Sequence, residues 1–266
     1  MAKLQQGDVF DDRYRLLRKL GVGCYSEVWL AEDTLANLEY VLRIFVEVDR
    51  DMFFHFQKEF ERVRNINHPN ILKYTYFNLS TEIPYLIMPY YIEGSAEGLI
   101  DRCTEQEGWM FLHDVASGLA CLHSQDPAFV HRNIKPENVL RSGNHFIITD
   151  YLNCYSLVNS ADREIRRNTQ GTRPYCAPEI FQLTTQPNPK SDIWSLAAVL
   201  FELLSGRLML ASMAYMSQLK EDLCRKLPTT ISNEMRDVIE KCLSLDPRHR
   251  PTAEELVSYV ERVGQQ

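Results

Sequence analysis

The chain has 266 residues, and its 29 Lys and Arg residues against 36 Asp and Glu residues give a net charge of −7. This acidic balance argues against a general nucleic-acid binder, because such proteins carry basic stripes and no run of five or more basic residues occurs here. Hydrophobic residues make up 45% and charged residues 24%, which are averages of globular proteins and exclude extensive disorder. The length suits one large domain or two lobes.

Neither a membrane span nor a secretory leader is predicted. The longest apolar stretch, residues 193–204, includes Glu202 and falls well short of the ~20 residues that a spanning helix needs, so it predicts a buried core helix. The N-terminus has no apolar core of a signal peptide. The seven cysteines include no C-x-x-C pair, which argues against a disulfide framework or a zinc site. We therefore expect reduced, mostly buried thiols in a cytoplasmic protein.

Apolar periodicity separates a strand-rich first part from a helical second part. Short apolar or alternating runs predict strands over residues 14–20, 27–31, 40–45 and 85–88. One amphipathic helix over about 51–66 interrupts them, because Phe53, Phe56, Phe60, Val63 and Ile66 recur with helical spacing. Beyond residue 95 the pattern becomes helical, and Thr252 with Glu255 forms a capping box before the last helix. The segment 89–95 joins the two parts as a candidate hinge.

A glycine-rich motif, G-V-G-C-Y-S-E-V at residues 21–28, lies between two predicted strands. Glycines at this spacing allow backbone N–H groups to approach phosphate oxygens, which a Cβ would obstruct. The motif alone is weak, since glycines between two strands usually mark only a hairpin. A dinucleotide-binding site would need a helix directly after the loop, whereas here a strand follows.

A second group of motifs lies further along the chain in a fixed order. Its members are His131-Arg-Asn133-Ile-Lys135-Pro-Glu-Asn138, Asp150-Tyr-Leu152, residues 171–179 (GTRPYCAPE), Asp192-Ile-Trp-Ser and Arg250. Their order and spacing resemble the eukaryotic-type (Hanks-type) Ser/Thr protein kinases from about Tyr14 to Val260. The resemblance implies an α+β, bilobal fold. It places an N-terminal extension at 1–13, a β-rich N-lobe at 14–88, a hinge at 89–95 and a larger α-helical C-lobe at 96–266.

The resemblance also implies an ATP site. Gly21, Gly23 and Ser26 match the loop over the phosphates, and the positions that match the adenine pocket are Val28, Val41, Met88, Pro89, Tyr91 and Leu140. Pro89 has no N–H, but the family uses the carbonyl at this hinge position, so the site tolerates it. Val41 stands where the family usually has Ala, and its extra methyl groups are expected to narrow the pocket. Asn138 and Asp150 match the two Mg²⁺ ligands, both hard oxygen donors.

Two departures from the family pattern concern catalysis. Arg43 replaces the Lys that holds the nucleotide phosphates, with Glu59 as its partner by spacing, and a guanidinium does not reproduce a compact ammonium. Asn133 replaces the catalytic Asp beside Lys135, and an amide is essentially not a base. Both changes are also the near-isosteric substitutions by which a kinase is silenced deliberately. Val41 in place of Ala and Leu152 in place of Gly are not near-isosteric substitutions of this kind. Their presence favours a natural origin of Arg43 and Asn133.

The structural signatures of the family are retained. Glu179 and Arg250 match its buried ion pair, Asp192 matches the residue that anchors the catalytic loop, and His131 matches a packing residue. We therefore expect a pseudokinase that binds ATP with Mg²⁺ weakly and regulates or scaffolds a protein partner. The alternatives are a kinase of low rate and a scaffold that binds no nucleotide. Asn138 and Asp150 favour the pseudokinase and the low-rate kinase alike, whereas Val41 slightly favours the scaffold.

Overall fold

The computed structural model describes residues 4–23, 26–46, 57–58, 60–61, 63–78, 83–151, 173–181, 188–209 and 226–264. Within these ranges the chain forms two compact units. The first contains the residues up to Asn67 together with Leu72–Ile92, and the second contains His68–Ile71 and the residues from Glu93 onward. The division falls between Ile92 and Glu93, inside the segment 89–95.

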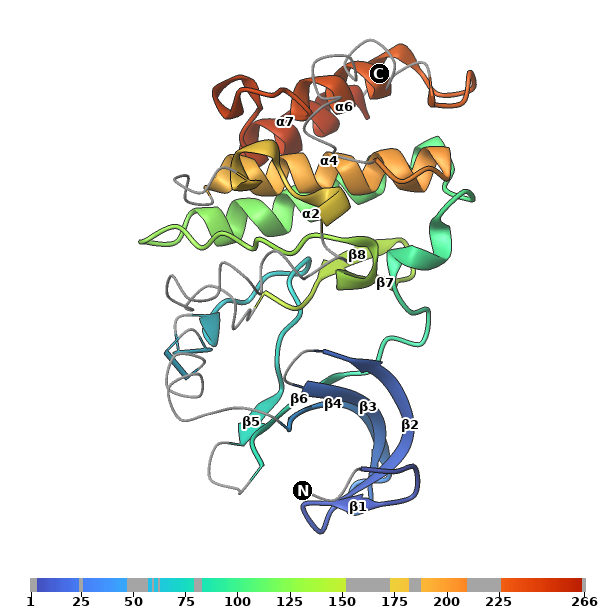
Figure 1. Ribbon diagram of the computed structural model, residues 1–266, viewed down its shortest axis with the longest axis vertical. Helices are drawn as coiled ribbons and strands as arrows, with labels where there is room; N and C mark the ends of the chain where they lie inside the picture. Colours follow the sequence, from blue (N-terminus) through green and yellow to red (C-terminus); the bar gives the residue numbers. More distant parts are fainter. Residues whose placement is uncertain are drawn as a thin grey trace. The chain divides into compact units, whose positions relative to one another are not determined.

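The first unit is a six-stranded antiparallel sheet with the strand order β1-β2-β3-β4-β6-β5, and Figure 1 shows it curled. Its strands are β1 (Val9–Phe10), β2 (Tyr14–Val22), β3 (Ser26–Asp33), β4 (Leu38–Phe45), β5 (Tyr76–Asn78) and β6 (Tyr85–Pro89). The four predicted strands are confirmed with slightly wider bounds. Strands β1 and β5 were not predicted, because two or three residues are too few to show a period.

The two faces of this sheet differ in their packing. Side chains alternate along a strand, and residues paired across neighbouring strands share a face. One face forms the core of the unit, with the buried residues Phe10, Tyr14, Leu16, Trp29, Ala31, Leu42, Ile44, Tyr85 and Ile87. The rings of Phe10 and Tyr14 both meet the ring of Tyr85 edge-on, at centroid distances of 5.1 and 5.8 Å. The positions of β3, β4 and β6 that alternate with these core residues therefore belong to the second face.

The second unit is built mainly from helices, which form the layers labelled in Figure 1. They are α2 (Glu105–His123), α4 (Pro189–Ser205), α6 (Asn233–Cys242) and α7 (Ala253–Val263), with short 3₁₀ turns at η1 (Ala96–Leu99), η2 (Pro136–Asn138), η5 (Arg173–Tyr175), η6 (Pro178–Phe181) and η7 (Pro247–His249). Helix α2 contacts both α4 and α7. A hairpin of β7 (Val139–Ser142) and β8 (His145–Ile148) also packs on α2.

Capping side chains fix where these helices begin. The Thr252 hydroxyl accepts a hydrogen bond from the Glu255 N–H while the Glu255 carboxylate accepts from the Thr252 N–H, so the predicted capping box is confirmed. Helix α4 contains the apolar stretch 193–204 and is buried along nearly its whole length, which confirms the predicted core helix. In the described part of the chain, no helix combines the length and apolar character needed to cross a membrane.

Three expectations from the sequence need correction or lie partly outside the described residues. The β7–β8 hairpin interrupts the part beyond residue 95 that was expected to be helical, because four-residue strands give little periodicity. Of the helix expected over 51–66, the described residues 57–58, 60–61 and 63 are helical, and Arg64 and Asn65 already form a turn. The thiols are less buried than expected: among the four cysteines described, only Cys242 is buried.

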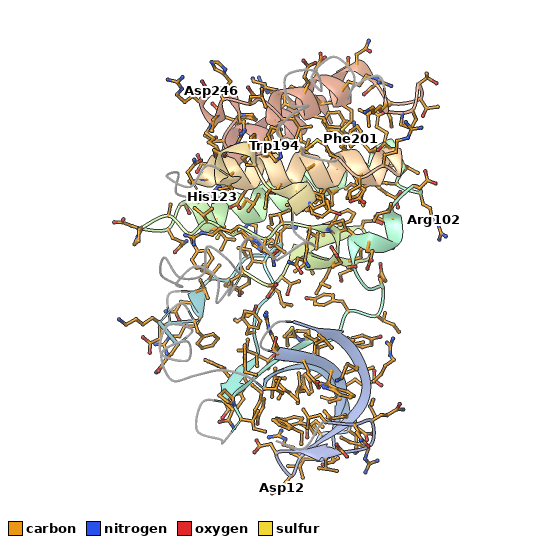
Figure 2. All side chains as sticks on the ribbon, viewed as in Figure 1. Asp12, Arg102, His123, Trp194, Phe201 and Asp246 are labelled. Carbon is orange, nitrogen blue, oxygen red and sulfur yellow. The ribbon has the colours of Figure 1, made fainter. Side chains whose placement is uncertain are left out.

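A buried ion pair holds the end of the second unit together. The guanidinium of Arg250 donates to both carboxylate oxygens of Glu179, at 2.7 and 2.8 Å, and to the carbonyl oxygens of Lys190 and Ser244. The guanidinium carbon Cζ of Arg250 also lies 5.0 Å from the ring centroid of Trp194, which is labelled on α4 in Figure 2. Although burial by itself would raise the pKa of Glu179, the hydrogen bonds from Arg250 lower it below the usual 4.5.

We expect Arg250→Ala to reduce the free energy of unfolding by about 3 to 5 kcal/mol, because it leaves the Glu179 carboxylate buried without its partner. Arg248→Ala is the matched control, since Arg248 lies two residues away and pairs with Asp246 at an exposed site. Thermal unfolding of both variants measures the difference. Equal melting temperatures for the two variants would contradict the assigned role of the pair.

The same pair predicts a pH dependence of stability. The pKa of Glu179 is lower in the folded chain than in the unfolded chain, so its contribution is fully present above about pH 4.5 and is lost as the pH falls through the folded value. The difference in melting temperature between the parent and Glu179→Gln should therefore shrink as the pH falls below 4.5. A difference that grows on acidification would contradict this sign.

Candidate functional site

The second face of the β-sheet in the first unit carries the residues predicted to surround a nucleotide. Val28 is paired with Arg43 across β3 and β4, and Val41 is paired with Met88 across β4 and β6. Because Val41 and Arg43 are two residues apart on β4, all four side chains lie on one face. Val41 and Met88 are buried, and Val28 is partly exposed. The sheet therefore places three apolar side chains beside one cation.

Arg43 is tied to the residue that follows the glycine-rich loop. Its Nε donates to the Ser26 hydroxyl at 3.1 Å, and its guanidinium carbon lies 5.6 Å from the ring centroid of Phe45 on the same face. Ser26 is buried at the start of β3. The bond uses Nε, a donor that a Lys side chain does not have, so Ser26 orients this cation in a way specific to Arg.

The glycine-rich loop links β2 to β3, as the sequence predicts. The Gly23 N–H donates to the Ser26 carbonyl oxygen at 2.7 Å, which closes the turn, and a Cβ on Gly23 would lie 3.2 Å from the Ser26 hydroxyl oxygen. Around Gly21 an added Cβ would meet nothing within 4 Å. Strand β6 ends at Pro89, and Tyr91 follows it, partly exposed with a pKa raised by burial.

In the second unit a buried carboxylate organises the loop that contains Asn133. Asp192 is fully buried on α4, and its two oxygens accept the backbone N–H groups of His131 and Arg132, each at 2.8 Å. His123, the last residue of α2, donates from Nε2 to the same carboxylate at 2.9 Å. Burial would raise the pKa of Asp192, but these donors lower it, so the carboxylate is ionised.

The ring of His131 connects this anchored backbone to Asn133. Its Nδ1 accepts the Asn133 N–H at 3.2 Å, and its Nε2 faces the Thr149 carbonyl oxygen at 3.0 Å. Since Nδ1 accepts, Nε2 carries the proton, and the pKa of His131 is lowered by burial, in agreement with a neutral ring. The side chain is thus a packing and positioning group, as the sequence analysis expected.

Asn133, Asn138 and Asp150 lie together. The Asn133 side-chain Nδ2 donates to Asp150 Oδ2 at 2.9 Å, and the Asn138 Nδ2 donates to the Asn133 main-chain oxygen at 2.8 Å. Asn138 also accepts the Thr149 N–H on its own carbonyl oxygen at 2.9 Å. Asp150 has a positive φ of 60°, in the left-handed region that Asp tolerates better than most residues. The two predicted metal ligands are therefore joined through Asn133.

Of the remaining predicted residues, two lie in the described part of the chain and two lie outside it. Lys135 precedes η2 and its Nζ lies 4.0 Å from Glu137, while Leu140 is partly exposed on β7, opposite Ile147. Glu59, the expected partner of Arg43, and Leu152 lie outside the described residues.

The donor set present here fits the group that the resemblance implies. The Nδ2 of Asn138 is engaged with a carbonyl, which turns the amide oxygen toward other partners, and Asp150 supplies a carboxylate. One amide oxygen and one carboxylate are the hard donors that Mg²⁺ takes alongside substrate phosphates. A bound Mg²⁺ ion would supply charge stabilisation of the nucleotide phosphates.

Three functional contacts were not predicted from the sequence. They are the bonds His123 to Asp192, Arg43 to Ser26 and Asn133 to Asp150. Each joins residues 17 to 69 positions apart, and no local pattern indicates such pairs. The replacement of an expected Asp by Asn at position 133 was the one available signal, since it substitutes a donor for an acceptor.

Comparison with known proteins identifies the family of the chain. Residues 14–260 match the family described as Protein kinase domain. The chain is 30% identical over 254 residues to the serine/threonine-protein kinase sid1 of Schizosaccharomyces pombe, covering 92% of this chain and 53% of that protein.

Two further relatives are more distant. An Aurora kinase of Saccharomyces cerevisiae is 28% identical, with 90% of this chain and 66% of that protein covered. The CBL-interacting protein kinase 26 of Oryza sativa is 27% identical, with 90% and 50% covered. The chain thus spans between half and two thirds of the length of these relatives. With the match over residues 14–260, the chain belongs to the eukaryotic-type Ser/Thr protein kinase family and has its bilobal fold, a small β-rich N-lobe and a larger α-helical C-lobe.

Proposed function

We propose that this protein-kinase domain is a pseudokinase that binds ATP weakly and acts as a regulatory or scaffolding module. The observation that carries the proposal is the state of Asn133 at the position of the family's catalytic base. Its amide cannot accept a proton from a substrate hydroxyl, and its N–H is already donated to Asp150. General-base catalysis contributes about 10² to 10⁴ in rate, so its loss alone removes most turnover.

Arg43 supports the same proposal from the first unit. The family's Lys at this position places a compact ammonium against the nucleotide phosphates, whereas the guanidinium of Arg43 is held by Ser26 through Nε. Phosphoryl transfer depends mainly on positioning and charge stabilisation, and a displaced cation affects both. The positive charge is kept, so weak attraction of a nucleotide remains.

The retained features favour a nucleotide-binding module over an empty scaffold. Val28, Val41, Met88 and Leu140 supply apolar surface for adenine, and Asn138 with Asp150 supplies oxygen ligands for Mg²⁺. A module of this kind signals through the conformation that a protein partner recognises. We place it in the cytoplasm, in line with its expected reduced thiols.

A kinase of low rate is the second candidate function. It is favoured by the intact anchoring of the catalytic loop, because Asp192 holds the backbone of His131 and Arg132 at 2.8 Å. A loop held in this way keeps the remaining groups in place, and phosphoryl transfer survives the loss of a base in part.

The first test is nucleotide binding. ATP with Mg²⁺ at about 5 to 10 mM should raise the melting temperature by a few degrees at most, because a weak site is only modestly saturated. Val41→Ala should enlarge the shift by widening the adenine pocket. Val46→Ala is the matched control, since it removes the same methyl groups beside the core face of the sheet. The absence of any shift, in parent and Val41→Ala alike, would support the scaffold instead.

The second test is phosphotransfer. Asn133→Asp alone should recover little activity, and Arg43→Lys with Asn133→Asp should recover more than the two single variants combined. The base acts only on a hydroxyl that faces a correctly held γ-phosphate, so the two defects affect one transition state and combine non-additively. The measurement is transfer of labelled γ-phosphate to a generic Ser/Thr substrate, with Asp150→Ala as the blank. If the parent chain already transfers phosphate well above this blank, it is an enzyme of low rate.

A further inference from the structure

Asn133 does more than remove a base, because its amide forms a bond that an aspartate could not form. An ionised carboxylate has only acceptors, so two facing carboxylates cannot hydrogen-bond to one another. The Asn133 Nδ2 donates to Asp150 Oδ2 at 2.9 Å, which is the usual length for a bond to a carboxylate. With Asn in place of Asp at position 133, the contact with Asp150 is therefore attractive, whereas two carboxylates would repel one another.

The backbone of Asn133 is fixed on both sides, so this side chain is aimed at Asp150 by the loop itself. Its N–H donates to His131 Nδ1 at 3.2 Å, and its carbonyl oxygen accepts from Asn138 Nδ2 at 2.8 Å. His131 is held in turn by Asp192 through its own N–H. The residue therefore contacts both predicted metal ligands, one through its side chain and one through its main chain.

An N–H that occupies a carboxylate oxygen competes with a divalent cation for that oxygen. The donor takes one of the lone pairs of Oδ2, so a cation bound at this oxygen would have to share it with the amide.

We propose that Asn133 is a positioning residue that weakens the binding of divalent cations at Asp150, so that Mg²⁺ adds little to the nucleotide affinity of this chain. The inference deepens the proposed nucleotide binding and rests on it only for the second measurement below. We therefore predict a small coupling between Mg²⁺ and the nucleotide, which means that each changes the affinity for the other by only a small factor.

The first measurement uses the full chain without nucleotide, in EDTA and in Mg²⁺. The parent should melt at nearly the same temperature in both. Asn133→Asp should melt about 3 to 6 °C lower in EDTA, because two carboxylates then face one another, and Mg²⁺ should restore most of the loss. Asn144→Asp is the matched control, because Asn144 lies in the exposed turn between β7 and β8, and it should show no Mg²⁺ response.

A swapped variant separates this electrostatic role from a steric one. Asn133→Asp with Asp150→Asn restores an amide–carboxylate pair in the opposite direction, and its melting temperature in EDTA should return toward that of the parent. If Asn133→Asp alone does not fold, this double variant still tests whether the charges at the two positions determine stability. Asn133→Ala, which removes the donor without adding charge, should fall between the parent and Asn133→Asp in its Mg²⁺ response.

The second measurement is the affinity for ADP in EDTA and in Mg²⁺, by calorimetric titration. The parent affinity should change by less than about threefold, and that of Asn133→Asp by more than about tenfold, which is typical coupling between two ligands. A parent that needs Mg²⁺ for ADP as strongly as Asn133→Asp does would overturn the inference. So would an Asn133→Asp variant as stable in EDTA as the parent. If no variant binds ADP under either condition, the proposed nucleotide binding fails, and the melting data alone decide the role of Asn133.

Discussion

A single buried carboxylate, that of Asp192, organises the part of the chain where the candidate chemistry lies. It has no exposed surface, and it is compensated by donors from the end of α2 and from two successive backbone N–H groups of the loop that contains Asn133. A buried charge is tolerated only when it is hydrogen-bonded in this way. The loop geometry is therefore as fixed as the helix core that carries Asp192, and the position of Asn133 follows from it.

The loop around Asn133 is held by groups other than the Asn133 side chain. The groups that build the loop are the carboxylate of Asp192, the ring of His131 and backbone atoms, and none of them depends on the side chain at position 133. The residue at that position is thus open to substitution without loss of the loop. The amide at this position donates a hydrogen bond to the neighbouring carboxylate. The hydrogen bonds that hold the loop are therefore compatible with an amide at position 133.

The sheet of the first unit shows a similar separation of structure from function. Its core face is packed with aromatic and aliphatic side chains, and its second face carries Val28, Val41, Arg43 and Met88. None of these four residues belongs to the cluster that packs on the core face. The bond from Arg43 to Ser26 shows that a residue unusual for the family acquires a specific partner in this chain.

Much of the fold and of the candidate site was predictable from the sequence, because the information is local or lies in spaced motifs. Periodicity gave the four main strands and the core helix, the capping box at Thr252 and Glu255 marked the start of α7, and the motif order indicated the kinase family. Residue types also identified Asn133 and Arg43 as departures from the family pattern. None of these inferences needed the three-dimensional arrangement.

The tertiary structure decided which groups meet. The contact of His123 with Asp192, of Ser26 with Arg43 and of Asn133 with Asp150 depends on side-chain directions that distant elements impose. The same holds for Gly118 on α2, where an added Cβ would lie 2.8 Å from the carbonyl oxygen of Asn70. Sequence alone indicated the family and the presence of Asn at position 133, where the family pattern has Asp. That the amide at this position is a hydrogen-bond donor to Asp150 follows only from folding, because it requires side-chain atoms from two separate loops, Asn133 Nδ2 and Asp150 Oδ2, to lie 2.9 Å apart.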